Sequence, residues 1–167
     1  MSSDQAHGSG RTLGPMIERL FDRGVFATFG SVETSRRGRQ VFEVTWHKGR
    51  VLQIAFDRAS RTLTVPNLLP ALDRKSPLYK ALRAFVASFS DCDRPEHRRA
   101  PPEKVLVILS LRDGFARLSV RTLDGDLEYA LSKLVQIVNE VFMLFLGSGE
   151  YFAYRVEHLG ADADWGT

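Results

Sequence analysis

Two kinds of hydrophobic pattern divide the first half of the chain into elements. In residues 12–24 the apolar side chains recur at helical spacing, Pro15 lies in the first turn, and Gly24 can end the helix. Apolar and polar residues then alternate along four segments, 25–33, 40–47, 50–57 and 61–65. Such alternation is typical of antiparallel strands that pack on one side only. Pro66 should end the fourth strand, because proline cannot donate to the ladder of hydrogen bonds.

The second half begins with a helix and a hairpin. Ser76 can cap a helix over residues 76–89, and Pro77 suits the first helical position. After a loop rich in charge and proline, residues 104–121 contain two strands joined at Asp113-Gly114, a strong hairpin signal. The first of these strands is apolar on both faces, which predicts a central place in the sheet.

A long helix over residues 124–147 follows, with carboxylates at its positive end. Its segment 134–146 is the most apolar stretch of the chain. A membrane-spanning helix needs about 20 consecutive apolar residues. Polar residues at 136, 139 and 140 interrupt this run, so we interpret it as a core helix that lies on the sheet and not as a membrane span.

These elements predict an α+β fold. We expect a single antiparallel β-sheet of about six strands, a meander plus a hairpin, packed on one face by helices in the order α-ββββ-α-ββ-α. One domain over residues 12–160 should lie between a flexible N-terminal tail (1–11) and a C-terminal tail (161–167). The element order resembles that of small bacterial secretion-chaperone-like domains. No sequence motif accompanies this resemblance, and the extra strand and the basic charge depart from it, so it carries no function.

The C-terminal end of the last helix is apolar on every side. From residue 141 to residue 146 all side chains are apolar, so this segment needs cover on more than one face. The first helix or the segment 150–159 could cover it, and so could another molecule. Phe142, Leu144 and Leu146 should project away from the sheet. The candidate partner-binding residues are Val141, Phe142, Met143, Leu144 and Leu146. A two-fold homodimer with Phe142 and Met143 near its contact would bury them.

The charge is distributed unevenly along the chain. The net charge is +3, but residues 1–121 hold 21 Lys or Arg against 12 Asp or Glu, and residues 122–167 hold 2 against 8. An acidic C-terminal element could neutralise the basic remainder internally. The alternative is a surface for an anion or a nucleic acid, formed by a hairpin tip and an open sheet face. The candidate residues for this alternative are Arg36, Arg37, Arg39, Arg117 and Arg121.

No signature of catalysis is visible. Cys92 is the only cysteine, and its neighbours Asp91 and Asp93 would disfavour a reactive thiolate. The four histidines include no pair at i, i+3 or i+4, and there is no G-x-S-x-G motif. We therefore expect no catalytic residue, no metal and no cofactor. A single cysteine and a tail without an apolar leader favour a cytoplasmic location.

The sequence thus predicts a small cytosolic, non-catalytic binding or adaptor protein that acts through protein–protein contacts. A nucleic-acid- or anion-binding domain is the first alternative. An enzyme whose site is not visible in the sequence is the second.

Overall fold

The computed structural model describes residues 13–34, 38–46 and 49–159. The predicted tails and the tip of the first hairpin, with Arg36 and Arg37, lie outside the described residues. The helices are α1 (Leu13–Asp22), α2 (Pro77–Ala87), α3 (Leu127–Glu140) and α4 (Phe152–Leu159). The strands are β1 (Thr28–Thr34), β2 (Arg39–Trp46), β3 (Arg50–Asp57), β4 (Thr62–Leu69), β5 (Val105–Arg112) and β6 (Phe115–Thr122).

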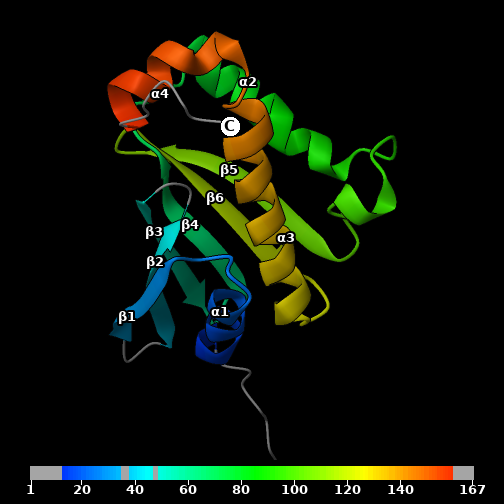
Figure 1. Ribbon diagram of the computed structural model, residues 1–167. Coiled ribbons are helices and arrows are strands. Elements are labelled where there is room, and N and C mark those ends of the chain that lie inside the picture. The colour runs from blue at the N-terminus through cyan, green and yellow to red at the C-terminus, as the bar shows by residue number, and fades with distance from the viewer. Residues whose placement is uncertain (1–12, 35–37, 47–48, 160–167) are drawn as a thin grey trace, which may run out of the picture.

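The fold is α+β, as the patterns predict. All six strands pair antiparallel in one sheet with the order β1-β2-β3-β4-β6-β5. Figure 1 shows α1 and α3 on the same face of this sheet, with α2 and α4 close together at one end. The structure adds α4, which the predicted order of elements lacks.

The predicted end of the fourth strand is wrong. Pro66 does not end β4, which continues to Leu69. The register of β4 against β6 shifts between Val65 and Leu69, and this irregularity accommodates the proline, which has no N–H for the ladder. The helix starts agree with their sequence signals. The Ser76 side chain accepts a hydrogen bond from the Tyr79 N–H at 3.1 Å, and Asp126 caps α3 in the same way at 3.0 Å.

The core lies between the sheet and α3. Alternate residues of the strands face it, and the buried side of α3 covers them. Among its fully buried members are Leu52, Ile54, Leu63, Leu118, Val120, Leu134 and Val138. On the opposite face of the sheet, side chains such as Val51, Leu106 and Ile108 are exposed.

The end of α3 departs from regular helix. Residues Val141–Phe145 form a π-helical turn, in which the Leu146 N–H donates to the Val141 carbonyl oxygen at 2.9 Å. Gly147 follows this turn, and the backbone of Met143 passes close to it. A Cβ atom at this position would lie 2.2 Å from the Met143 carbonyl oxygen, so glycine fits here without displacement.

Within the described residues, no single helix is long and apolar enough to cross a membrane. The required length and hydrophobicity are reached only by two segments taken together, Leu127–Phe145 and Gly149–Leu159. The chain bends by 85° at the break between them.

Candidate functional site

Strand β5 forms an edge of the sheet, so the prediction of a central place for it is wrong. Val107, Leu109 and Leu111 face the helices and are half-buried against the core. Leu106 and Ile108 point to the other face, where 44% and 45% of their surface is exposed. The strand is therefore apolar on both faces, although the described residues cover only one of them.

The outer edge of β5 carries unpaired backbone groups. Asp113 and Gly114 both have positive φ (51° and 79°), which defines a type I′ turn and makes Arg112 and Phe115 a hydrogen-bonded pair. Hydrogen-bonded and non-hydrogen-bonded pairs then alternate along the hairpin. The backbone N–H and C=O groups of Val107, Leu109 and Leu111 consequently point away from β6. Among the described residues they have no hydrogen-bond partner.

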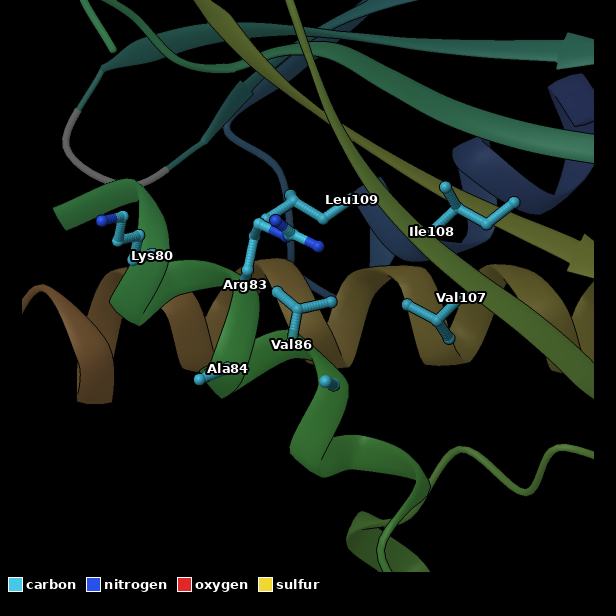
Figure 2. Close-up of a pocket in the computed structure, with 8 residues that line it drawn as sticks. Lys80, Arg83, Ala84, Val86, Val107, Ile108 and Leu109 are labelled. Atoms are coloured by element: carbon cyan, nitrogen blue, oxygen red, sulfur yellow. The ribbon is translucent and has the colours of Figure 1, made fainter. Parts of the chain in front are cut away.

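A hollow of about 480 Å³ lies between this edge and α2. Figure 2 shows α2 running beside β5, with the Arg83 side chain extending from the helix toward the strand where Leu109 lies. The small side chains of Ala84 and Ala87 leave space on the helix side. The full lining is Lys80, Arg83, Ala84, Val86, Ala87, Val107, Ile108 and Leu109, so it combines an apolar interior with two cations and contains no carboxylate.

The opposite edge of the sheet is built differently. Strand β1 contains Gly30, and its register against β2 shifts between Ser31 and Glu33, which marks a β-bulge. Bulges twist an edge away from further pairing, and proteins also use charge, proline or short strands for this purpose. By contrast, β5 pairs without interruption from Val105 to Arg112 and has no proline, no bulge and no charge before Arg112. In the described part of the chain, β5 thus lacks the protection by bulge, proline or charge, and α2 lies beside it with a hollow between them.

The predicted partner-binding residues divide into two groups. Val141, Phe142 and Leu146 are buried in the core, so the expectation that Phe142 and Leu146 project away from the sheet is wrong. The π-helical turn explains Leu146, because it brings residues five apart, Val141 and Leu146, to one side of the helix. Phe142 follows Val138 by four residues and therefore shares its buried side. Met143 and Leu144 do point outward, and 57% and 54% of their surface is exposed.

Much of the cover at this end of α3 comes from the chain itself. The Phe145 ring stacks on Tyr151 with centroids 4.7 Å apart and also contacts Phe85 of α2 at 5.3 Å. The guanidinium of Arg50 lies over the Phe142 ring, 5.4 Å from its centroid. The segment 150–159 therefore contributes cover, as one of the alternatives expected, and α2 contributes as well.

The predicted anion-binding arginines do not form one cluster in the part of the chain that is described. Arg39, Arg117 and Arg121 belong to strands β2 and β6, which β3 and β4 separate. The register aligns Arg39 with Asp57, Asp57 with Thr62, and Thr62 with Arg121. A carboxylate thus lies in the same row as the two arginines and reduces the local positive charge.

A buried ionic cluster joins the loop before β5 to α3. The Glu140 carboxylate is buried and accepts hydrogen bonds from Arg98 Nε at 2.9 Å and Arg94 Nη1 at 3.4 Å. Arg94 also lies over the Phe89 ring at 3.9 Å. Lys133 is buried nearby, and its Nζ donates to the His97 carbonyl oxygen and to Gln136. Burial lowers the pKa of Lys133, while the charge of Glu140 opposes this shift. These groups support one another, and we assign them a structural role.

The described residues hold little that points to catalysis. They contain no group of three or more His, Cys, Asp or Glu side chains arranged to hold a metal ion. Cys92 is exposed in the loop before β5. Burial raises the pKa of Tyr154, whose hydroxyl donates to the Pro70 carbonyl oxygen at 2.5 Å, and this contact fastens α4 to the end of β4.

No family model matches the chain, and searches of curated proteins and of solved structures find no match either. The function is therefore inferred from the geometry of the molecule. The α2/β5 groove, defined by the unpaired edge of β5 and the hollow beside α2, is the candidate site. Sequence reasoning missed it because Ala84 and Ala87 are ordinary helix residues and the strand order is not visible in local patterns.

Proposed function

We propose that this chain is a non-catalytic protein-binding module that takes an extended segment of its partner as an added strand on β5. The observation that carries the proposal is the unpaired backbone edge of β5 beside a hollow of about 480 Å³. Extended peptides add to exposed sheet edges in this way: main-chain hydrogen bonds supply affinity, and pockets for alternate side chains supply specificity.

Two further features support the proposal. Long, regular and apolar edge strands are aggregation hazards, and proteins rarely leave them without protection unless something covers them. An added strand would pair with the outward groups of Val107, Leu109 and Leu111. It would also cover apolar surface next to Leu106 and Ile108, which are exposed on the other face of the sheet.

The test uses a display library of random nine-residue peptides selected against the immobilised chain. We expect enriched peptides that bind at micromolar dissociation constants. N-methylation of single peptide amides should abolish binding at every second position only, because a strand directs alternate N–H groups to its neighbour. Absence of enriched peptides, or a loss of binding without this alternation, would overturn the proposal.

A pair of substitutions at one position provides the matched control. Leu109→Pro removes an N–H that points away from β6, so the hairpin keeps its own hydrogen bonds while the added strand loses one. Leu109→Ala removes more of the side chain but retains the N–H, so a larger loss of binding in Leu109→Pro cannot come from lost side-chain contacts. We expect Leu109→Pro to bind clearly more weakly than Leu109→Ala, with thermal unfolding used to verify that both variants fold.

The nucleic-acid alternative has less support, since Asp57 lies in the row between Arg39 and Arg121. A salt titration separates the two functions. Binding to phosphates weakens steeply with salt because counterions are released, whereas an added strand depends mainly on backbone and apolar contacts. The cytoplasmic location and self-association through Met143 and Leu144 stay predictions, and light scattering on the purified protein tests the second.

A further inference from the structure

The α2/β5 groove carries a charge that its surroundings do not neutralise. Lys80 and Arg83 lie about one turn apart on α2, both are exposed, and neither forms an ion pair with another described residue. The arginines of the neighbouring loop differ, because Arg94 and Arg98 are already paired with Glu140. Helix α2 itself contains no Asp or Glu. Its two cations are therefore available to a molecule in the groove.

A second copy of the chain fits this groove poorly. A two-fold pairing of β5 with β5 of another molecule would place both α2 helices on the same face of the joined sheet. Lys80 and Arg83 would then face the same two cations across the axis, and like charges at an interface oppose association. An acidic segment, in contrast, would be attracted by the positive charges of Lys80 and Arg83.

We infer that the occupant of the groove is an extended segment of a different protein. On the side that faces the groove, this segment carries an apolar side chain at one position and an acidic side chain two positions away. This inference rests on the proposed function. Side chains at i and i+2 of a strand point to the same face. An apolar side chain could therefore enter the hollow over Val86, Val107 and Leu109, while an Asp or Glu two positions away faces Lys80 or Arg83.

The experiment compares charge variants of the full chain with the random nine-residue library. The first variant is Lys80→Glu/Arg83→Glu, which inverts the charge of the groove. Its matched control is Arg74→Glu/Lys75→Glu, which exchanges the same residue types for the same net charge just before α2, outside the groove. Each chain is used to select peptides, and the strongest wild-type binder is also made with Gln or Lys in place of its acidic residues.

We expect the wild type and the Arg74→Glu/Lys75→Glu control to enrich Asp and Glu at alternate peptide positions. The Lys80→Glu/Arg83→Glu variant should enrich Lys and Arg there instead. The acidic peptide should bind the wild type about tenfold more tightly than its Gln twin, and its Lys twin should bind more weakly still. Raising the salt concentration should reduce the difference.

The outcomes separate this inference from the proposed function. Equal binding of the three peptide twins, or equal effects of the two charge variants, would overturn the acidic preference and leave strand addition standing. If no peptide binds, both ideas fail. A dimer in sedimentation experiments that Leu109→Pro dissociates would identify a second copy as the occupant. Binding of an oligonucleotide that Lys80→Glu/Arg83→Glu abolishes would identify a nucleic acid. Either result overturns the inference.

Discussion

Arg98 Nε donates a hydrogen bond to the buried carboxylate of Glu140 at 2.9 Å, across 42 positions of sequence. The contact fixes the loop that leads into β5 on the side of α3. Because β5 forms the proposed binding edge, this ion pair also determines where the strand begins relative to the core.

Glu140→Gln should destabilise the fold. The substitution leaves the largely buried Arg94 guanidinium without its charged partner, and breaking such pairs costs about 3–5 kcal/mol of unfolding free energy. Urea denaturation measures the loss, and trypsin should cleave more rapidly after Arg98 and Arg99, whereas Pro95 protects the bond after Arg94. Glu128→Gln is the control, since its ion pair with Arg19 is exposed and should be worth less than about 1 kcal/mol. Equal losses for the two variants would contradict the prediction.

Tyr154→Phe should remove a pH dependence of stability. Burial raises the pKa of Tyr154, so the folded chain keeps this proton at pH values where the unfolded chain, with a pKa of about 10, has lost it. The contribution of Tyr154 is fully present below pH 10 and is lost as the pH rises above it. The unfolding free energy of the wild type should therefore fall more steeply than that of Tyr154→Phe between about pH 10 and 11.5.

The same substitution should cost about 1–2 kcal/mol at neutral pH, because the Pro70 carbonyl loses its hydrogen bond. Denaturant titrations at several pH values measure both effects. Tyr129 and Tyr151 titrate in both proteins, so the difference between wild type and variant isolates Tyr154. If the unfolding free energies of wild type and Tyr154→Phe change with pH in parallel, the Tyr154 hydroxyl is not buried against the Pro70 carbonyl and the prediction is wrong.

Gly147→Ala should destabilise the end of α3. The new Cβ would lie 2.2 Å from the Met143 carbonyl oxygen, and a backbone atom can yield only by distorting the π-helical turn. We expect a loss of about 1–3 kcal/mol in thermal unfolding. Gly149→Ala is a close control, because no atom lies within 4 Å of its Cβ and the change should be nearly neutral. The prediction fails if the two alanine variants unfold alike.

Phe142→Ala and Met143→Ala should differ strongly although their positions are adjacent. Only 1% of the Phe142 surface is exposed, so its truncation leaves a core cavity that costs about 3–5 kcal/mol. Met143 is mostly exposed, and its truncation should change the stability by less than about 0.5 kcal/mol. Chemical denaturation of the purified variants tests this. If Phe142→Ala is as stable as Met143→Ala, Phe142 does not belong to the core and the prediction is wrong.

Local patterns were sufficient for most of the fold. Ser76 and Pro77 mark the start of α2, and Asp113-Gly114 marks the turn between β5 and β6, because each of these residues acts on its own few neighbours. The place of β5 in the sheet was not predictable in this way. An apolar face looks the same in sequence whether another strand, a helix or a partner covers it.

The candidate site was less predictable than the fold. The predicted apolar side of the last helix excluded Phe142 and Leu146. Phe142 nevertheless shares a side with Val138, four residues earlier, and the π-helical turn adds a residue that brings Leu146 into the core. The α2/β5 groove depends on the distance between two elements that a loop of seventeen residues separates, and on the small size of Ala84 and Ala87. Neither property has a local signature.

The bulge in β1 determines the stoichiometry of any complex formed by strand addition. A sheet with two receptive edges can polymerise, since each added molecule offers a new edge to the next. Here the register shift between Ser31 and Glu33 blunts one edge, and a partner strand on β5 would occupy the other. The chain therefore offers one receptive edge, so each chain should bind one partner segment directly, and copies of the chain should not join edge to edge into fibres.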